Sequence, residues 1–310
     1  MLPGDAGVVV RRAGDIQVEP GKPLGEVLQE KPGGDGAAAV LAGVADVGIV
    51  AADQVLVLRE VRHAPEPLAG VPGGPGQAAV PAVVGGHDTG GHIAQHGVHH
   101  TIPPHKINYR ANIYALKMLD VKAVVSTTAV GSLNPDYKAG ELVLVDQFID
   151  MTKSREGTFY DGEHYGVAHL DMTHPYCETL RQAIIRAAEE EHITLHPHGT
   201  YICTEGPRFE TPAEIKAYRQ WGADVVGMTN LPECVLAREA EICYSTISMV
   251  TNFAAGISDT PLSHREVVDC MNHNLESFKK IITILSRTYD PDTECSCHHA
   301  AKDFGGFHLL

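Results

Sequence analysis

The amino-acid composition changes sharply near residue 95, and this change limits where the chain can build a hydrophobic core. Residues 1–100 contain no Phe, Tyr, Trp, Ser, Asn or Cys, yet they hold 19 of the 31 glycines. A segment that lacks aromatic residues and is rich in Gly, Pro, Ala and Val is a poor core builder. We expect residues 1–95 to be an atypical segment, either disordered or read from a shifted frame, with short strands at Val44–Val50 and Gln54–Leu58. The folded domain is expected at residues 96–290, followed by a C-terminal tail at residues 291–310.

After residue 108, short β-rich runs alternate with segments whose apolar residues have helical spacing. The last helix is expected to begin with the capping box Ser263–Glu266. Such alternation predicts an α/β fold in which helices cover both faces of a sheet. The expected strands are 121–127, 141–145, 201–204, 224–228 and 242–251, and the expected helices include 175–190 and 212–221.

The formal net charge is −15 at pH 7. A chain of this charge is repelled by nucleic acids and by anionic membranes, so we expect neither as a partner. A small phosphorylated substrate is still allowed, because it needs only a local positive site. No apolar run reaches the length of a membrane span, and the N-terminus lacks the pattern of a signal peptide. These features predict a cytoplasmic protein.

Two of the β-rich runs end in hydroxyl residues that could bind an anion. Val125–Ser132 ends in small hydroxyl residues and glycine, and such a strand end exposes backbone N–H groups beside hydroxyls. The alternative is a strand that simply turns. In Val226–Glu233, Thr229 offers a hydroxyl to an anion and Met228 an adaptable apolar surface to a sugar. Ordinary core packing is the alternative for Met228.

Two further strand ends carry groups that suit a purine. Phe209 offers a ring face to a planar base, and Glu210 offers a carboxylate to a ring N–H. Alternatively, Glu210 is simply favoured near the N-terminus of the next helix. Asn252 ends an apolar run, and its amide both donates and accepts hydrogen bonds. The alternative is a turn residue held by its own backbone.

In this order, these segments resemble the trimeric and hexameric nucleoside phosphorylases, in particular the branch with the methylthioadenosine phosphorylases. The resemblance covers roughly two-thirds of the chain. It implies an α/β three-layer sandwich, with a central mixed β-sheet flanked by helices, and a homotrimer or homohexamer. The matching stretches are His96–Ile102, Lys106–Asn112, Thr127–Ser132, Val145–Asp150, Phe159–Gly162, Glu205–Phe209 and Gly227–Glu233.

The resemblance also implies roles for individual residues. In this family phosphate attacks the anomeric carbon from the face opposite the base, through a transition state that resembles an oxocarbenium ion. Glu210 and Asn252 would be the catalytic residues, acting on the purine. The residues expected at the phosphate are His96, His100, Thr128, Ala129 and Thr229. Those expected at the nucleoside are Phe209, Glu210, Met228, Asn252, Ala254 and His264.

Two positions bear on the choice of substrate. Glu210 can accept the N1–H of hypoxanthine or guanine, which adenine lacks, while the Asn252 amide donates to O6 or N7. Methylthioadenosine enzymes carry Asp where this chain has Asn252. His264 matches the context of a histidine that reaches a 5′-hydroxyl, although a solvated histidine is the alternative. The resemblance thus implies phosphorolysis of inosine and guanosine in purine salvage, with phosphate as co-substrate and no cofactor. Methylthioadenosine or methylthioinosine is the alternative substrate.

The first 95 residues depart from the family pattern. The family opens with a strand and a Gly-Gly-Thr/Ser-Gly loop that binds phosphate, but Gly33–Gly36 and Gly73–Gly76 lack the hydroxyl. Gln95 stands where the family has Arg, which removes a positive charge from the phosphate site. For the chain as written, we expect weak phosphate binding and little activity. An inactive member of the family is therefore a further alternative.

Two groups of residues raise the alternative of a metal-binding protein. Five histidines crowd residues 87–100, and Cys295–His299 lies near the end of the chain. Metal ligation requires a geometry that sequence alone does not give, so no metal is assigned. Some thermophilic members of the family resemble this chain in a terminal Cys-x-Cys with a redox or stabilising role. A solvent-exposed tail is the other interpretation.

Overall fold

The computed structural model describes residues 102–162, 165–258 and 264–307, together with five strands before residue 95. For residues 264–273 and for those five strands only the backbone is described. The expected strand Val44–Val50, His96 and His100 lie outside the described residues. The five strands are β1 (Ala6–Arg11), β2 (Asp15–Pro20), β3 (Gln54–Leu58), β4 (Val83–Gly86) and β5 (Gly90–Ala94).

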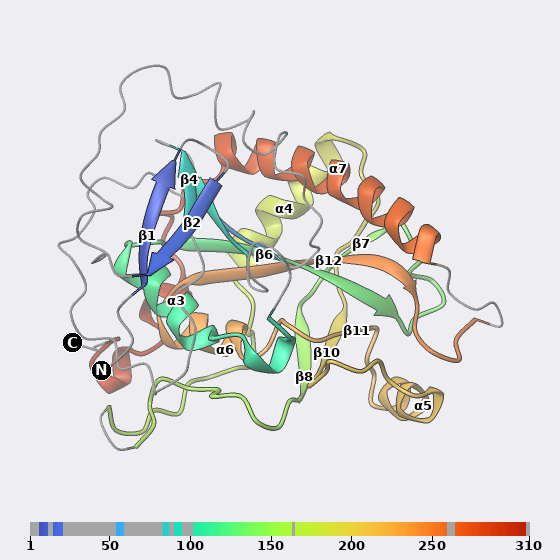
Figure 1. Cartoon of the computed structure of the whole chain (residues 1–310), viewed down its shortest axis with the longest axis horizontal. Coiled ribbons are helices and arrows are strands. Elements are labelled where there is room, and N and C mark those ends of the chain that lie inside the picture. The colour runs from blue at the N-terminus through green and yellow to red at the C-terminus, as the bar shows by residue number, and fades with distance from the viewer. Residues whose placement is uncertain are drawn as a thin grey trace.

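From residue 102 onward, strands and helices alternate as expected (Figure 1). The strands are β6 (Ala123–Ser132), β7 (Leu142–Leu144), β8 (Gln147–Met151), β9 (Leu195–His196), β10 (Thr200–Thr204), β11 (Val225–Gly227) and β12 (Cys243–Phe253). The α-helices are α3 (Tyr109–Met118), α4 (Glu178–Glu190), α5 (Pro212–Gln220), α6 (Glu233–Glu239) and α7 (His264–Thr288). Short 3-10 helices occupy η1 (Pro104–Lys106), η2 (Ser296–His299) and η3 (Lys302–Phe304). None of the described helices combines the length and the apolarity needed to cross a bilayer.

Ten of the described strands form one mixed sheet around β6. β6 pairs in parallel with β12 and antiparallel with β3, and its end also pairs antiparallel with β11. β10 lies parallel to both β11 and β8. The expected strand Gln54–Leu58 is therefore confirmed as β3, and it joins the main sheet through β6. β1 and β2 form a separate two-stranded sheet.

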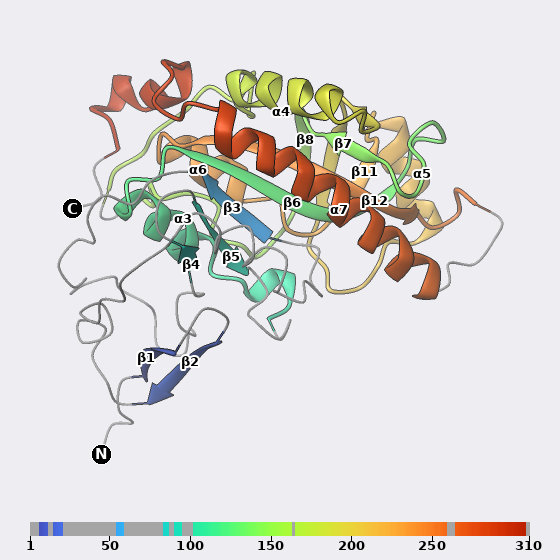
Figure 2. The same cartoon turned by 90° about the horizontal axis from the view of Figure 1, so that it is seen from above.

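Side chains of the two long central strands alternate between two apolar layers. Val124 and Tyr244 pack in a cluster with residues of α3 and α6, whereas Val125 and Ile247 pack in a cluster with residues of α4 and α7. Figure 2 shows α4 and α7 on one side of β6 and α3 on the other. The predicted arrangement of a mixed sheet between two layers of helices is confirmed.

The start and the end of α5 follow from its sequence. Thr211 caps the helix, since its hydroxyl accepts from the Glu214 backbone N–H while the Glu214 carboxylate accepts from the Thr211 N–H. Beyond the helix, Gly222 has a φ of +89°, a conformation that favours glycine and ends the helix. The Ser263–Glu266 capping box lies partly outside the described residues.

Residues near the C-terminus are packed onto the domain. Cys297 is 4% exposed and Ala301 is fully buried. The Phe307 ring packs edge-on against Phe159, at 5.3 Å between centroids, and also contacts Tyr114. The interpretation of a solvent-exposed tail is therefore wrong for these residues.

Candidate active site

The sheet brings the ends of four strands together. Cys203 of β10 is in register with Gly227 of β11, so the loops after these two parallel strands leave the sheet side by side. Gly131 of β6 pairs with both Val226 of β11 and Asn252 of β12. The segments that the sequence marked as candidate binding loops thus meet at one edge of the sheet.

The loop after β10 fixes the orientation of Glu210. Its Oε1 accepts a hydrogen bond from Thr204 Oγ1 at 2.6 Å, and the same hydroxyl lies 3.5 Å from the carbonyl oxygen of Gly227. Glu210 Oε2 makes no hydrogen bond with any described residue, which leaves it free to accept from a ligand. Phe209, one residue earlier, is 83% exposed and presents its ring to solvent.

Met228 packs closely on this loop. Gly206 has a φ of +67°, and a Cβ atom there would lie only 2.6 Å from Met228 Sδ. Glycine is therefore favoured at position 206 by its backbone conformation, and any larger residue would also displace the Met228 side chain. Met228 is half-buried, so part of its side chain remains available for an apolar contact.

Thr229 carries a hydroxyl that is buried and unpaired. The residue is 1% exposed, and its Oγ1 has no hydrogen-bond partner among the described residues. An unsatisfied buried hydroxyl costs about 1–3 kcal/mol, so a bound acceptor at this position would be stabilising. Thr128 is also buried, but its hydroxyl shares a 3.0 Å hydrogen bond with Ser248. Ala129, next in β6, is half-buried.

Asn252 lies beside an irregularity in β12. The pairing of β12 with β6 shifts register between Val250 and Asn252, and such a bulge changes the direction of the side chains that follow it. Thr251 Oγ1 donates to Asn252 Oδ1 at 2.7 Å, and Asn252 Nδ2 donates to the Phe253 carbonyl at 2.8 Å. These are the local contacts of a turn residue. They still leave one amide N–H and one lone pair for a ligand.

Two further close contacts involve the segments that follow β6, β10 and β12. A Cβ on Gly256 would lie 2.9 Å from Pro212 Cβ, so the chain after β12 lies directly against the residues that follow Glu210. A Cβ on Gly131 would lie 3.4 Å from Ala254 Cα, and Ala254 is 6% exposed. Glu210 and Asn252 therefore belong to adjoining segments.

Comparison with known proteins identifies the family. Residues 46–287 match the model of the phosphorylase superfamily. The chain belongs to this superfamily. The match begins well before residue 96, and it includes the strands β3, β4 and β5.

Several relatives of this chain carry names that state an activity. It is 53% identical over 214 residues to a probable 6-oxopurine nucleoside phosphorylase of Dictyoglomus turgidum, covering 69% of this chain and 81% of the relative. It is 50% identical over 236 residues to the 6-oxopurine nucleoside phosphorylase of Pyrococcus furiosus, covering 74% and 89%. An S-methyl-5′-thioadenosine phosphorylase of Thermofilum pendens is 49% identical over 211 residues, covering 68% and 79%.

A solved structure supports the same assignment of fold. Methylthioadenosine phosphorylase from Schistosoma mansoni, in complex with adenine, aligns with a TM-score of 0.63 and 31% sequence identity. The alignment covers 70% of this chain and 83% of that chain. The expected nucleoside phosphorylase-like fold is thereby confirmed.

No sequence pattern identified Arg155 as a residue of the site. Its side chain is 2% exposed, and its guanidinium donates to the backbone carbonyls of Leu231 at 2.5 Å, Thr204 at 3.2 Å and Glu205 at 2.9 Å. Arg155 therefore links the loops after β10 and β11. It lies in a long irregular connection with no periodicity, which gives no signal that it is buried.

The carboxylate of Glu205 reinforces this link. Burial opposes its ionisation, but hydrogen bonds from Ser154 and Lys153 and the charge of Arg155 outweigh burial and hold the pKa of the carboxyl below its ordinary value. A charged Glu205 thus ties the loop after β10 to residues 153–155. Burial raises the pKa of the neighbouring Cys203 thiol to about 12, so that thiol stays protonated.

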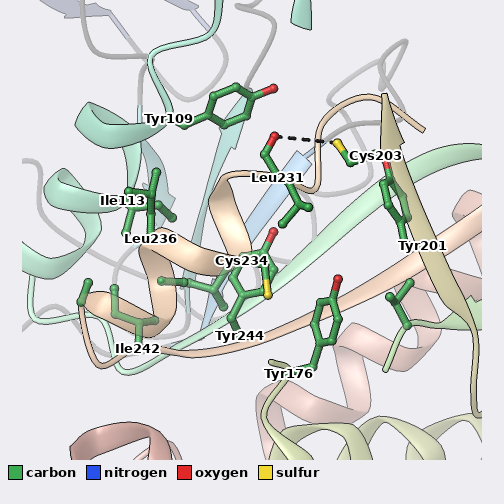
Figure 3. Close-up of a cluster of buried hydrophobic side chains, with 14 of the residues drawn as sticks. Tyr109, Ile113, Tyr176, Tyr201, Cys203, Leu231, Cys234, Leu236, Ile242 and Tyr244 are labelled. Atoms are coloured by element: carbon green, nitrogen blue, oxygen red, sulfur yellow. Dashed lines mark hydrogen bonds between the residues drawn. The ribbon is translucent and has the colours of Figure 1, made fainter. Parts of the chain in front are cut away.

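A buried layer supports the loop after β11 from below. Figure 3 shows Leu231 above Tyr244 and Cys234, with its carbonyl oxygen facing the Cys203 thiol, which donates to it at 3.8 Å. Glu233 is fully buried and accepts a 2.6 Å hydrogen bond from the Tyr244 hydroxyl. Burial, with the nearby charge of Glu233, raises the pKa of Tyr244 well above its usual value. The residues that directly follow Thr229 are therefore buried and hydrogen-bonded.

Other predicted site residues lie outside this description. His96, His100, Gln95 and the glycine-rich stretches 33–36 and 73–76 are outside the described residues. The backbone of His264 begins α7, but its side chain is not described. The histidines of residues 87–100 are likewise not described as side chains. Four cysteines do form a cluster with metal-ligand spacing, at the opposite end of β12 from Asn252.

Proposed function

We propose that this chain catalyses the phosphorolysis of 6-oxopurine ribonucleosides, releasing the purine base and ribose 1-phosphate for purine salvage. The observation that carries the proposal is the placement of Glu210 and Asn252 on adjoining segments, at the end of the sheet where Thr229 holds an unpaired hydroxyl. Its relatives named as 6-oxopurine nucleoside phosphorylases point to the same substrates.

The purine side of the site would distinguish 6-oxo from 6-amino bases. Glu210 Oε1 is occupied by Thr204, and Oε2 would accept the N1–H of hypoxanthine or guanine. The remaining N–H of Asn252 would donate to O6 or N7. As the glycosidic bond breaks, negative charge spreads into the purine, and this donor stabilises it. Adenine offers a lone pair at N1, so it would leave a carboxylate unpaired.

The phosphate side would use the buried hydroxyl. Thr229 Oγ1 would donate to a phosphate oxygen, as would backbone N–H groups around Thr128 and Ala129. By resemblance, His96 and His100 would complete this half and Met228 would lie against the ribose. Phe209 would cover the base and His264 would reach the 5′-hydroxyl. Inorganic phosphate is the co-substrate, and we propose no cofactor.

A phosphate-dependent assay tests the proposal. Purified protein is incubated with inosine, adenosine or methylthioadenosine, each with and without phosphate, and the released base is measured. We expect hypoxanthine release from inosine that requires phosphate and exceeds release from the two adenine nucleosides. Faster release of adenine from methylthioadenosine would instead assign the chain to the activity that its thioadenosine-named relatives carry. No release from any substrate would identify an inactive member.

The proposed assembly is a homotrimer or homohexamer in the cytoplasm. The largely exposed rings of Phe209 and Trp221 are apolar surface that a neighbouring copy could cover. Light scattering coupled to size-exclusion chromatography measures the mass directly. A monomer at micromolar concentration would contradict this assembly.

A further inference from the structure

Four cysteine thiols from distant parts of the chain meet at one point. Cys177 caps α4, Cys243 begins β12, and Cys295 and Cys297 belong to the turn at η2. Their four sulfur atoms all lie within 4.8 Å of one another. Cys295 Sγ lies 3.6 Å from Cys177 Sγ and 3.4 Å from Cys243 Sγ. All four are free thiols.

These spacings are those of ligands around a common centre. Four sulfurs placed tetrahedrally at about 2.3 Å from a zinc ion lie about 3.8 Å from one another. The cysteines are also sheltered, because three are buried and Cys295 is half-buried. A buried ion of +2 charge must be paired with opposite charge, and the four thiols of this cluster would supply it once ionised.

Hydrogen bonding separates this cluster from the other buried cysteines. Cys203 and Cys234 each donate to a carbonyl oxygen, of Leu231 and Pro175 respectively, and Cys203 Sγ also accepts from Arg155 Nη1 at 3.9 Å. That is the ordinary way in which a buried S–H group is satisfied. These two residues therefore need no ligand.

Among the described residues, no clustered sulfur donates to a carbonyl oxygen, and N–H groups lie near these sulfurs. Arg238 Nη1 donates to Cys297 Sγ at 3.5 Å, and the backbone N–H of Cys297 donates to Cys295 Sγ at 3.3 Å. The N–H of Leu180 donates to Cys177 Sγ at 3.5 Å, and His298 Nε2 lies 3.4 Å from Cys243 Sγ. Three of the four sulfurs thus accept from an N–H group, and the fourth lies beside a ring nitrogen that donates in one tautomer of His298. Four thiolates around a divalent ion leave a net charge of −2, which such donors stabilise.

We propose that Cys177, Cys243, Cys295 and Cys297 bind one zinc ion that has a structural role. A site with four thiolate ligands is closed and leaves no position for water or substrate. Soft thiolate ligands in a tetrahedral arrangement select zinc over magnesium or calcium. Cys243 and Asn252 are nine steps apart along an extended strand, which corresponds to about 30 Å at ~3.3 Å per residue. The ion would therefore join η2 to α4 and β12 without entering the candidate active site.

Metal analysis of the full chain tests this site. Protein expressed with zinc in the medium is purified under reducing conditions without chelator, and zinc is measured by mass spectrometry of the elements. We expect about one zinc per chain, and at least a fivefold loss in Cys295→Ser and Cys297→Ser. Cys203→Ser and Cys234→Ser are the matched controls, because they remove buried thiols outside the cluster, and they should retain the metal.

Cobalt provides a readout that needs no variant. The reduced, metal-free protein is titrated with Co²⁺, and a tetrahedral thiolate site gives intense visible absorption that saturates at one equivalent and disappears when zinc is added. Absence of both zinc and this absorption would overturn the proposal. A mass lower by two or four hydrogens in protein purified without reductant, together with no zinc, would assign the cluster to disulfide bonds instead.

Discussion

The carboxylate of Glu210 accepts a hydrogen bond from Thr204, and in the proposed function its orientation would determine which purine it can bind. One oxygen accepts from the hydroxyl, and the other makes no hydrogen bond with a described residue, so it is available to a ligand. A carboxylate in this state accepts hydrogen bonds and cannot donate one. In the proposed function, the choice between 6-oxopurine and 6-aminopurine would therefore depend on this one acceptor.

Replacing Glu210 with Gln should weaken this selection. The amide keeps the shape of the side chain but loses the charge, and a hydrogen bond to a charged group contributes about 1.5–3 kcal/mol. We expect kcat/KM for inosine to fall ~10- to 100-fold, with a smaller fall for adenosine. Steady-state kinetics with both nucleosides measures the change. Glu276→Gln, on the exposed side of α7, is the control. Equal losses for the two substrates would contradict the assigned role.

Gly227 illustrates how a single atom constrains the loop that follows it. A Cβ on Gly227 would lie 2.1 Å from Tyr201 Oη, and Tyr201 is fully buried. We expect Gly227→Ala to destabilise the fold by about 1–3 kcal/mol. Thermal unfolding measures this effect. Tyr201→Phe removes the closest atom, so the double variant should recover part of the loss. Unchanged stability in Gly227→Ala would show that the tyrosine can shift.

At the scale of elements, the regular strands were predictable because their apolar pattern is strong. The expected strands 201–204, 224–228 and 242–251 correspond to β10, β11 and β12, within two residues at each end. β8 was missed because its residues are largely exposed or half-buried, which leaves no apolar run. The irregular segments were the least predictable. Arg155 and the meeting of Cys177 with Cys243 depend on how distant segments pack, and no local pattern records that.

Arg155 should control activity through the loops that it joins. Lysine retains the charge but has one nitrogen, so Arg155→Lys cannot serve the carbonyls of Leu231, Thr204 and Glu205 together. We expect kcat for inosine to fall ~10-fold or more, since Thr229 and Glu210 lie on these loops. Arg186→Lys on the exposed face of α4 is the control. A change in melting temperature without any change in kcat or KM would mean that the link is structural only.

At the scale of the whole molecule, the composition break near residue 95 does not coincide with the edge of the sheet. β3 pairs with five residues of the central strand β6, and β5 pairs in turn with β3. The family match likewise begins at residue 46. The composition predicts a weak core builder before residue 95, but a strand can join a sheet through backbone hydrogen bonds without contributing large side chains.

Two truncations should therefore behave differently. A chain that starts at residue 46 loses only β1 and β2 among the described strands, and these form a sheet of their own. We expect its melting temperature to stay within about 2 °C of the full chain, because the larger sheet loses no described strand.

A chain that starts at residue 96 also loses β3, β4 and β5, which exposes the backbone of β6 along its pairing with β3. An exposed apolar edge strand favours aggregation, so this shorter chain should be recovered mainly in the insoluble fraction. Thermal unfolding and soluble yield of the three chains measure the difference. Equal stability of all three would show that residues 46–95 add nothing to the fold, and that the core begins at the composition break after all.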